Sequence, residues 1–496
     1  MAKIKKLRLS VIQANIALKL FTNSIVFLIT VALSYLVPRT LGPATYGNFN
    51  YIHTLLTKVV NFFSLGTIQG FYTRISGDNR EKWLVSLYLK FVFIQVILTG
   101  ILLIFSLYFF PELLGFDGWN VVLYVLAFFY SLLMYVLNIF RQIFDAIGKT
   151  NISEYILLTQ RILIAILVLA ASTSGFLDLK VYYVILASVL GITLMILLRI
   201  LYKGGFFIKS YCSLRKLWFY VRYFKNYSSP IFLLSIVVLI VGVTERVLVQ
   251  RYGGSTEQGY FGLGLAVSTV FGLLVASVVP IFTREASRFV KVNDTKSLQK
   301  AFVLHTNYMY HILSCVSVFL VFKIEILVPL IWGENFSDGS LAIGIMLLLP
   351  LHQLITQMST AVLYSTSNTR EIRKIGIPIN ILGILGFYIF LSVGSVHISS
   401  SVGLACKMLM LQFVSSNFYL LKVAKLLELE FALLFLGQLL VPLIFIVIIW
   451  SIKSSFNCLG IDGSLLQELL VYTVSSAIYG FVFFKLKYNY SFNMKK

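Results

Sequence analysis

The sequence predicts an all-α membrane protein with about fourteen transmembrane helices. Of its 496 residues, 59% are hydrophobic and 12% are charged, whereas soluble domains are about 45–50% apolar and about 25% charged. Apolar runs of about 20 residues, each long enough to cross a bilayer, recur from one end of the chain to the other. Because a water-soluble fold cannot bury this much apolar surface, nearly the whole chain is expected to lie in a membrane.

The individual spans are predicted from windows in which apolar residues predominate over the length that a bilayer requires. The basic first ten residues precede an apolar stretch that is long and has no small-residue cleavage motif, so a retained first helix is expected rather than a signal peptide. In chain order, the expected spans are residues 14–37, 47–72, 83–110, 119–141, 154–175, 180–202, 228–251, 259–283, 302–328, 339–365, 375–394, 402–422, 429–452 and 463–485.

The distribution of basic residues predicts the orientation of these spans. An even number of spans places both termini on one side; if that side is cytoplasmic, its loops and tails hold 30 of the 41 Lys and Arg residues, with 4 on the other side and 7 inside spans. The positive-inside rule therefore predicts cytoplasmic termini. The net charge of +22 follows from this topology, and no nucleic-acid partner is expected. Residues 203–227 mix cations with aromatic residues, which predicts a cytoplasmic amphipathic connector against anionic headgroups.

Two turns of the chain repeat one another. Residues 39–49 and 251–261 share an Arg, two Gly and a Phe at an offset of 212 residues. A weaker match relates residues 111–115 to residues 329–333 at an offset of 218. Glycine permits positive φ and close backbone approach, so the repeated glycines are predicted hinges, although simple turn formation explains them equally well. These glycines are Gly42, Gly47, Gly254 and Gly259.

The repeat also predicts the domain organisation. Spans one and seven are both odd-numbered, so the two halves run parallel, and such repeats are typical of transporters that hold substrate near the membrane midplane. The expected parts are an N-lobe at 1–202, the connector at 203–227, a C-lobe at 228–425, and two additional helices with a basic C-terminal tail at 426–496.

Several short segments match a known transporter family in order and spacing. They are the Arg39-to-Gly47 turn, Gly66 with Arg74, Ile331-Trp-Gly-Glu-Asn-Phe336, the polar stretch Ser365 to Arg373, and Val402-Gly-Leu404. Over residues 10–425 the chain resembles the polysaccharide transporter branch of the multidrug/oligosaccharidyl-lipid/polysaccharide exporter superfamily, the Wzx-type O-antigen and capsule flippases. The resemblance implies two six-helix lobes around a central cavity and alternating-access transport of an undecaprenyl-diphosphate-linked oligosaccharide.

Charged residues inside the spans supply the candidate site. A charge at bilayer depth costs about 2.5–3.5 kcal/mol on insertion scales, so it usually faces a cavity or a partner. The charges at depth are mainly basic, and basic side chains suit the roughly two negative charges of a diphosphate. A cationic cavity is therefore predicted. Its expected lining is Lys58, Arg246, Arg161, Asn61, Asn23, Ser34 and Lys19, with Arg39 and Arg251 at the outer mouth.

Each of the three deep cations has a structural alternative. Lys58 lies eleven residues into its span, about 16 Å deep at helical rise, so reaching a headgroup would need a long extension. Arg246 shares a polar helix stripe with Gly242 and could instead pair with Glu245 on its own or a neighbouring helix. For Arg161, about 10 Å deep, cavity lining and extension to the cytoplasmic surface are equally compatible with the sequence.

Two other functions compete with flipping. A cation-coupled drug antiporter of the same superfamily would need carboxylates at the midplane, and a glycan polymerase or ligase would need a large outer loop or an acidic cluster. Neither is apparent, so a transporter in the bacterial inner membrane is expected rather than an enzyme. No metal-ligand spacing or nucleotide-binding loop occurs, so no cofactor is expected, and a proton or sodium gradient is a compatible driving force. Expected partners are the lipid-linked oligosaccharide, membrane lipids and the polysaccharide polymerase and chain-length machinery.

Overall fold

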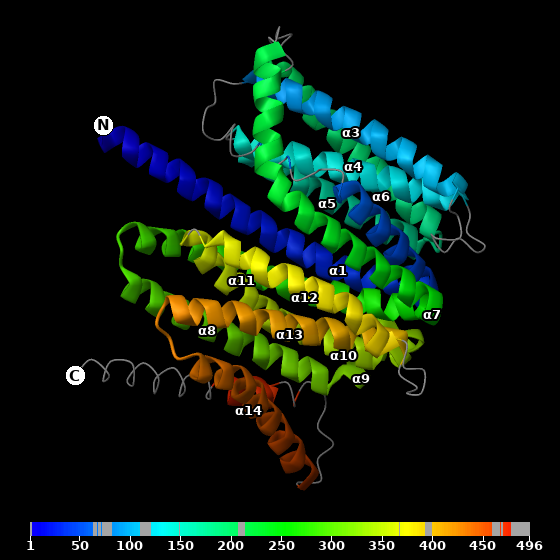
Figure 1. The fold of residues 1–496 in the computed structure, drawn as a ribbon. Helices are drawn as coiled ribbons and strands as arrows, with labels where there is room; N and C mark the ends of the chain where they lie inside the picture. Colours follow the sequence, from blue (N-terminus) through cyan, green and yellow to red (C-terminus); the bar gives the residue numbers. More distant parts are fainter. Residues whose placement is uncertain are drawn as a thin grey trace. The chain divides into compact units, whose positions relative to one another are not determined.

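The computed structural model describes residues 2–62, 67, 71, 82–109, 121–147, 149–206, 214–366, 368–391, 399–458, 467 and 470–477. All regular structure in these ranges is helical (Figure 1). The elements are α1 (Ala2–Phe62), α3 (Lys82–Phe109), α4 (Val121–Ala146), α5 (Thr150–Thr173), α6 (Leu179–Lys203), α7 (Leu214–Lys291), α8 (Thr295–Phe322), α9 (Ile324–Trp332), the 3-10 helix η2 (Glu334–Gly339), α10 (Ser340–Met346), α11 (Leu349–Ser365), α12 (Thr369–Leu391), α13 (Ser400–Leu426) and α14 (Phe431–Cys458).

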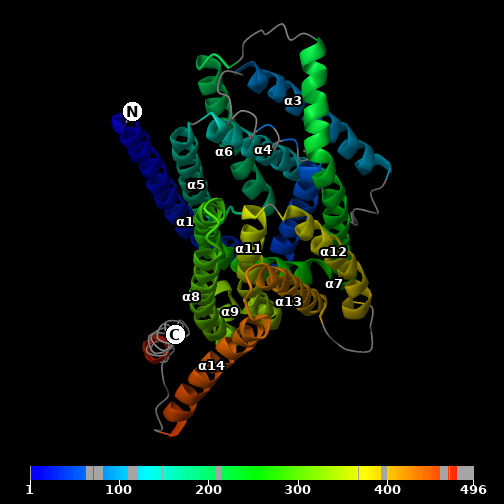
Figure 2. The ribbon, with the colours of Figure 1, turned by 60° about the vertical axis from the view of Figure 1, so that its left-hand side comes forward.

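The two longest helices, α1 and α7, each contain two of the expected spans. Each is interrupted by a single non-helical residue, Gly42 in α1 (φ 75°, ψ 167°) and Gly254 in α7 (φ 73°, ψ −172°). This backbone region is essentially restricted to glycine. Figure 2 shows the change of direction of α1. The two repeated turns are therefore sharp bends made by one glycine each, which explains why both positions are glycine.

The remaining helices agree with the predicted all-α transmembrane fold. Within the described residues, nine helices are long and apolar enough to span a membrane, or up to ten if a bent pair counts as one span. The bent pair is α8 and α9, which meet at 80°. A continuous span was expected at 302–328, but the helix ends at Lys323, which adopts φ −105° and ψ 11° as its C-cap.

Side-chain caps explain where two of the helices begin. Asp178 accepts a hydrogen bond from the backbone N–H of Val181 (2.7 Å), and Asp294 accepts one from the backbone N–H of Ser297 (3.0 Å). An N-terminal carboxylate satisfies otherwise unpaired amides and interacts favourably with the helix dipole. These caps fix the starts of α6 and α8 within the polar loops that the sequence places between spans.

The chain forms two compact units. Unit 1 comprises Met1–Leu263, Ile331–Gly339 and Asn380–Leu404. Unit 2 comprises Gly264–Leu330, Ser340–Ile379 and Ala405–Lys496. The boundary within α7 falls after Leu263, whereas the lobes predicted from the repeat divide at 203–227. The lobes describe repeated sequence and the units describe packing, so the predicted lobe boundaries stay a prediction.

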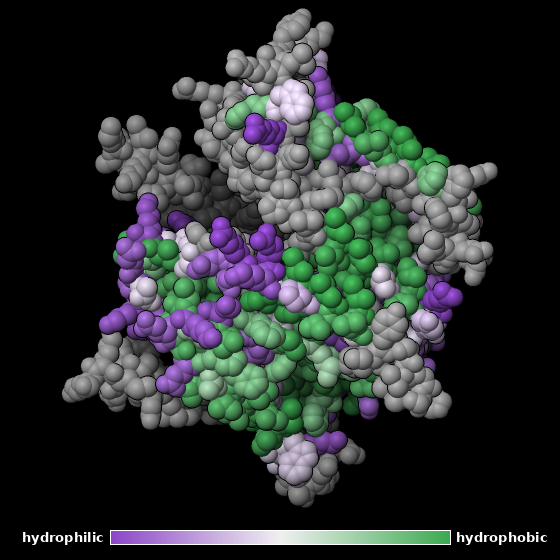
Figure 3. Space-filling model, in the orientation of Figure 1, coloured by the Kyte–Doolittle hydropathy of each residue, from purple (hydrophilic) through white to green (hydrophobic). Residues whose placement is uncertain are grey.

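Unit 2 has an extensive apolar core built from the end of α7 and from α8, α11, α13 and α14. Phe282, Phe302, Leu354, Met358 and Val423 are fully buried in it. Hydrophilic surface gathers where α8 and α12 begin and α13 ends (Figure 3). This polar end belongs to the loops predicted to be cytoplasmic.

An ion-pair cluster at that polar end links α12 to α13. The carboxylate of Glu371 accepts from Lys374 Nζ at 2.8 Å and from Lys422 Nζ at 2.9 Å. The hydrogen bond from Lys374, then that from Lys422, lowers the pKa of Glu371 from an ordinary 4.5 to about 2. A carboxyl whose folded-state pKa is depressed stabilises the fold above its unfolded-state pKa, and this contribution is lost as the pH falls through the folded-state value.

We expect Glu371→Gln to lower the melting temperature of the purified protein at pH 7. The difference from the unchanged protein should shrink between about pH 4.5 and pH 2, where the carboxylate becomes protonated. Thermal unfolding in nanodiscs at several pH values measures it. Because the cluster is exposed, 1 M salt should also reduce the difference. A difference that is constant across pH would exclude the ion pair as its cause.

Candidate functional site

The bends of α1 and α7 interlock within unit 1. A Cβ atom on Gly47 would overlap the carbonyl oxygen of Ser255, and one on Gly259 would overlap the carbonyl oxygen of Pro43. The repeat offset of 212 converts Pro43 into Ser255 and Gly47 into Gly259. The same contact is therefore made twice, in reciprocal form, as at an interface with two-fold symmetry. We call residues 42–50 and 254–262 the interlocked turns.

Polar side chains reinforce the interlocked turns. Ser255 Oγ donates to Asn48 Oδ1 (2.5 Å), and Gln250 Nε2 donates to Ser255 Oγ (3.1 Å). The side chain of Asn50 packs against Gly262, where a Cβ would lie 2.6 Å from the Asn50 amide. The four predicted hinge glycines therefore lie in one junction. Whether they act as hinges stays a prediction.

Two further segments of unit 1 attach to the same junction. Tyr260 donates from its hydroxyl to the carbonyl oxygen of Asn335 in η2 (3.3 Å). Glu257 Oε2 accepts from the backbone N–H of Ser401 (2.8 Å), which caps the start of α13. These bonds connect the α7 turn to segments that are distant from it in sequence.

The first arm of α1 is held by the segment 331–339. Trp332 Nε1 donates to the carbonyl oxygen of Ser34 (2.8 Å). Arg39 Nη1 donates to the hydroxyl of Tyr35 (2.7 Å) and to the carbonyl oxygen of Ile331 (3.3 Å). Of the predicted site residues, Ser34 therefore contributes its backbone here. The exposed Arg39 binds the 331–339 segment, which the sequence singled out independently.

Lys58 lies across α7. An ideal Cβ on Gly242 would overlap Lys58 Nζ and would lie 2.8 Å from its Cε and 3.0 Å from its Cδ. The end of the lysine thus occupies the space where a side chain of α7 would otherwise stand. Gly242 is buried and Lys58 is half-buried, so the structure brings together two polar features that the sequence placed in different spans.

Arg246 lies one helical turn after Gly242 and is 3% exposed. Its Nη1 donates to Gln258 Oε1 (3.3 Å), while Gln258 Nε2 donates to the carbonyl oxygen of Arg246 (3.0 Å). The guanidinium also lies over the ring of Phe261, 4.8 Å from its centroid. Both partners follow the bend at Gly254, so Arg246 connects the two arms of α7, a role the sequence did not predict.

An aromatic cluster extends from the second arm of α1 to α4 and α6. Phe49 stacks on His53 (5.5 Å between centroids) and contacts Tyr182 (5.1 Å) and Tyr183 (5.4 Å). Tyr130 contacts both His53 (5.3 Å) and Tyr183 (5.9 Å). The cluster lies between two predicted cations, because the charge of Arg246 acts on His53 and that of Arg161 acts on Tyr130 and Tyr182.

The other predicted site residues lie apart from this arrangement or outside the described part. Asn61 is exposed one residue before the end of α1, and Arg251 is exposed before the α7 bend. The backbones of Lys19 and Asn23 belong to α1, but their side chains lie outside the described residues. Gly66, Arg74 and the 111–115 repeat also lie outside them.

Sequence reasoning missed Gln258, Phe261 and the aromatic cluster. The repeat contained one available signal: Gln258 corresponds to Tyr46 at the offset of 212, in turns already selected. The cluster offered only the spacing of Tyr46, Phe49 and His53 on one helical face, which is common in apolar helices. Its contacts with α4 and α6 join residues about 80 to 130 positions apart and have no local signature.

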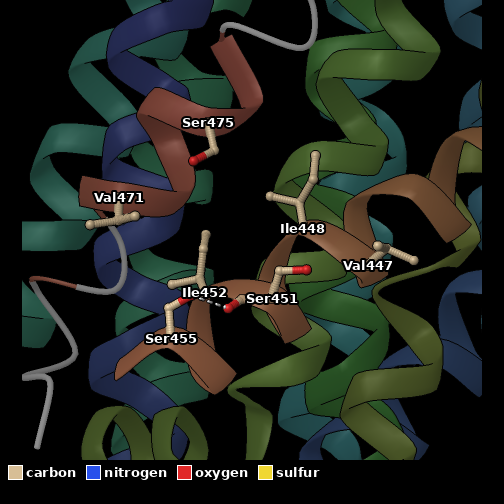
Figure 4. Close-up of a pocket in the computed structure, with 7 residues that line it drawn as sticks. All are labelled: Val447, Ile448, Ser451, Ile452, Ser455, Val471 and Ser475. Carbon is tan, nitrogen blue, oxygen red and sulfur yellow. Dashed lines mark hydrogen bonds between the residues drawn. The ribbon is translucent and has the colours of Figure 1, made fainter. Parts of the chain in front are cut away.

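Unit 2 contains a pocket between α14 and the helix at 470–477 (Figure 4). Its volume is about 490 Å³. Hydrocarbon side chains and serine hydroxyls face it, so its chemistry suits an alkyl chain better than a charged group. The lining residues are Val447, Ile448, Ser451, Ile452, Ser455, Val471 and Ser475.

Solved transporter structures share this fold. "Lipid II flippase MurJ, inward closed conformation" matches with a TM-score of 0.68 and 16% identity, covering 95% of this chain and 98% of that one. An inward-facing multidrug resistance MATE family transporter of the MOP superfamily matches with a TM-score of 0.61 and 14% identity, covering 82% and 95%. The MATE multidrug transporter DinF-BH gives 0.56 and 12%, covering 85% and 97%. No curated protein sequence matches this chain.

The fold therefore defines a multi-pass membrane protein of the exporter superfamily that the sequence resembles. Residues 12–285 match the family described as "Polysaccharide biosynthesis protein", and this match covers more than half of the chain. The chain belongs to that family. The resemblance to the polysaccharide transporter branch is thus confirmed.

Proposed function

We propose that this protein is a flippase that moves an undecaprenyl-diphosphate-linked oligosaccharide from the cytoplasmic to the periplasmic leaflet of the bacterial inner membrane by alternating access. The observation that carries the proposal is the arrangement of Lys58 over Gly242 with Arg246 one helical turn away. It puts two cations from different helices beside one stretch of α7, at depths where cations are expensive unless a function retains them.

The chemistry of a diphosphate fits this pair. Its oxygens accept charge-assisted hydrogen bonds, which are about twice as strong as neutral ones. Arg246 has five N–H donors, and its contact with Gln258 uses one, so donors remain for a ligand. Lys58 supplies a compact ammonium on a flexible stem, which suits a phosphate that arrives and leaves. Both charges act more strongly in a low-dielectric interior than in water.

The aromatic cluster and Arg161 extend the proposed site toward the sugars. Tyrosine offers an apolar ring face and a hydroxyl that can donate or accept a hydrogen bond. Tyr130 and Tyr182 lie within the influence of Arg161, so this side of unit 1 combines aromatic, hydroxyl and cationic groups. Oligosaccharides with acidic sugars would suit it best.

The interlocked turns support alternating access. The Arg39-to-Gly47 and Arg251-to-Gly259 turns lie on the outer side in the predicted topology, so their reciprocal contact would close that side. Opening it would require the two turns to separate. The backbone contacts are symmetric, so separation would break both at once, which favours two discrete states over a continuous series.

A cation-coupled drug antiporter is the competing function, and similarity to multidrug transporter folds favours it. Such a protein should move a cationic dye. The cations of unit 1 would repel that cargo unless carboxylates compensate. Uptake of the cationic dye rhodamine by proteoliposomes distinguishes the two functions.

Removing the gene tests the proposal in cells. The surface polysaccharide should be lost, and its lipid-linked repeat unit should accumulate in the inner membrane. Both effects should be reversed by the unchanged gene. Loss of drug resistance with intact surface polysaccharide would favour the antiporter instead.

The proposed direction of transport requires cytoplasmic termini. Single cysteines at Lys209 and Gly118, in a background without the native cysteines, should react with an impermeant thiol reagent from opposite sides. The position at 209 should be labelled only after the membrane is opened, because the connector is predicted to be cytoplasmic. Labelling of both positions from the same side would contradict the predicted topology.

A further inference from the structure

Gly242 differs from the other closely packed glycines of unit 1 in what fills the space of its missing side chain. At Gly47 and Gly259 that space is filled by backbone carbonyl groups, and at Gly191 in α6 nothing lies within 4 Å. At Gly242 it is filled by the last three atoms of the Lys58 side chain, Cδ, Cε and Nζ. A notch in α7 therefore receives the charged end of a residue from α1.

The position of the notch determines where the ammonium lies. Gly242 and Arg246 are four residues apart, so they share one face of α7. An ammonium in the notch consequently lies about one helical turn, roughly 5–6 Å, from the start of the arginine side chain. Any larger residue at 242 would displace the ammonium from this face, because the lysine end is flexible and the helix backbone is not.

We propose that Gly242 is a positioning residue, whose notch fixes the Lys58 ammonium beside Arg246 so that both cations meet the diphosphate of one substrate. This inference rests on the proposed function and adds a residue that has no charge and no hydrogen-bonding side chain. It also explains why a glycine occurs in the interior of a membrane helix at this point: any side chain would take the place of the lysine.

The substitution that tests it is Gly242→Ala. Alanine is a better helix former than glycine, so α7 itself is not put at risk. The added methyl group must displace only the end of Lys58. Affinity for undecaprenyl diphosphate, measured in nanodiscs, should fall about tenfold, the effect of losing one hydrogen bond to a charged group. The salt dependence of binding should also weaken, because one cation no longer contacts the ligand.

A double-mutant cycle separates positioning from packing. Lys58→Ala empties the notch, so adding Gly242→Ala to it should change affinity by less than about twofold, within ordinary additivity error. Gly191→Ala is the matched control, since it adds a methyl group to another helix of unit 1 in open space. It should leave affinity unchanged.

The outcomes distinguish this inference from the proposed function. If the unchanged protein does not prefer undecaprenyl diphosphate over uncharged undecaprenol, the diphosphate site and the positioning role both fall. If it does, and Gly242→Ala binds as well as the unchanged protein, only the positioning role is wrong. An equal loss from Gly242→Ala with and without Lys58 would show that the glycine serves packing alone.

Discussion

A disulfide between Asn48→Cys and Ser255→Cys is expected to stop transport. The two side chains are hydrogen-bonded at 2.5 Å across the interlocked turns, so cysteines there lie within reach of each other. If the turns must separate in every cycle, a covalent bond between them holds one state. We expect at least about a hundredfold loss, because a disulfide's stabilisation of about 2–4 kcal/mol adds to a contact that already favours closure.

The experiment is done in a chain whose four native cysteines, Cys212, Cys315, Cys406 and Cys458, are replaced. Transport should return when a reductant breaks the disulfide. A matched pair is Thr356→Cys with Gln412→Cys, whose side chains are hydrogen-bonded at 3.0 Å within unit 2. Cross-linking this pair should leave most transport intact. Full transport with 48 and 255 joined would mean that the turns are static packing and that their glycines are not hinges.

Loss of charge at Lys58 is expected to reduce transport by about ten- to a hundredfold, corresponding to about 1.5–3 kcal/mol for a hydrogen bond to a charged group. Lys58→Met keeps the length and apolar stem of the side chain but removes the ammonium, so the packing against Gly242 is largely preserved. Lys58→Arg should retain part of the activity, because it keeps the charge but brings a larger planar group to a small notch. Restoration of surface polysaccharide at low expression measures both. Full activity of Lys58→Met would favour an interfacial lysine instead.

Arg246→Gln belongs to the same prediction but needs its own control. Because Arg246 is buried against Gln258 and Phe261, its loss should also lower thermal stability. Gln258→Ala removes the hydrogen-bonding partner and keeps the cation. If Arg246 binds the diphosphate, Arg246→Gln should lose affinity well beyond Gln258→Ala at comparable stability. Equal losses from the two variants would assign Arg246 a purely structural role in joining the arms of α7.

Helix number and type were predictable because long apolar runs leave few alternatives in a membrane. The bends at Gly42 and Gly254 were also found, since the repeat at 212 residues marks both. The break at Lys323 was not predicted, because apolar residues continue on both sides of it and composition alone favours one span.

The candidate site was predictable in its residue types and not in its contacts. Depth and charge selected Lys58 and Arg246, yet nothing in the sequence indicated that the lysine lies on Gly242 or that the arginine meets Gln258 across a bend. Such contacts depend on how separate helices pack, which helical periodicity does not encode. The reciprocal contact of Gly47 and Gly259 is intermediate: the repeat pairs the residues, and only the fold reveals that they touch the opposite turn.

The most direct measurement is flipping by the purified protein in proteoliposomes that carry a fluorescent undecaprenyl-diphosphate-linked oligosaccharide in one leaflet. We expect the unchanged protein to expose the label in the opposite leaflet, Lys58→Met to do so at least about tenfold more slowly, and the rhodamine dye not to be transported. Transport of the rhodamine dye without movement of the lipid-linked oligosaccharide would contradict the proposed function and identify a drug transporter instead.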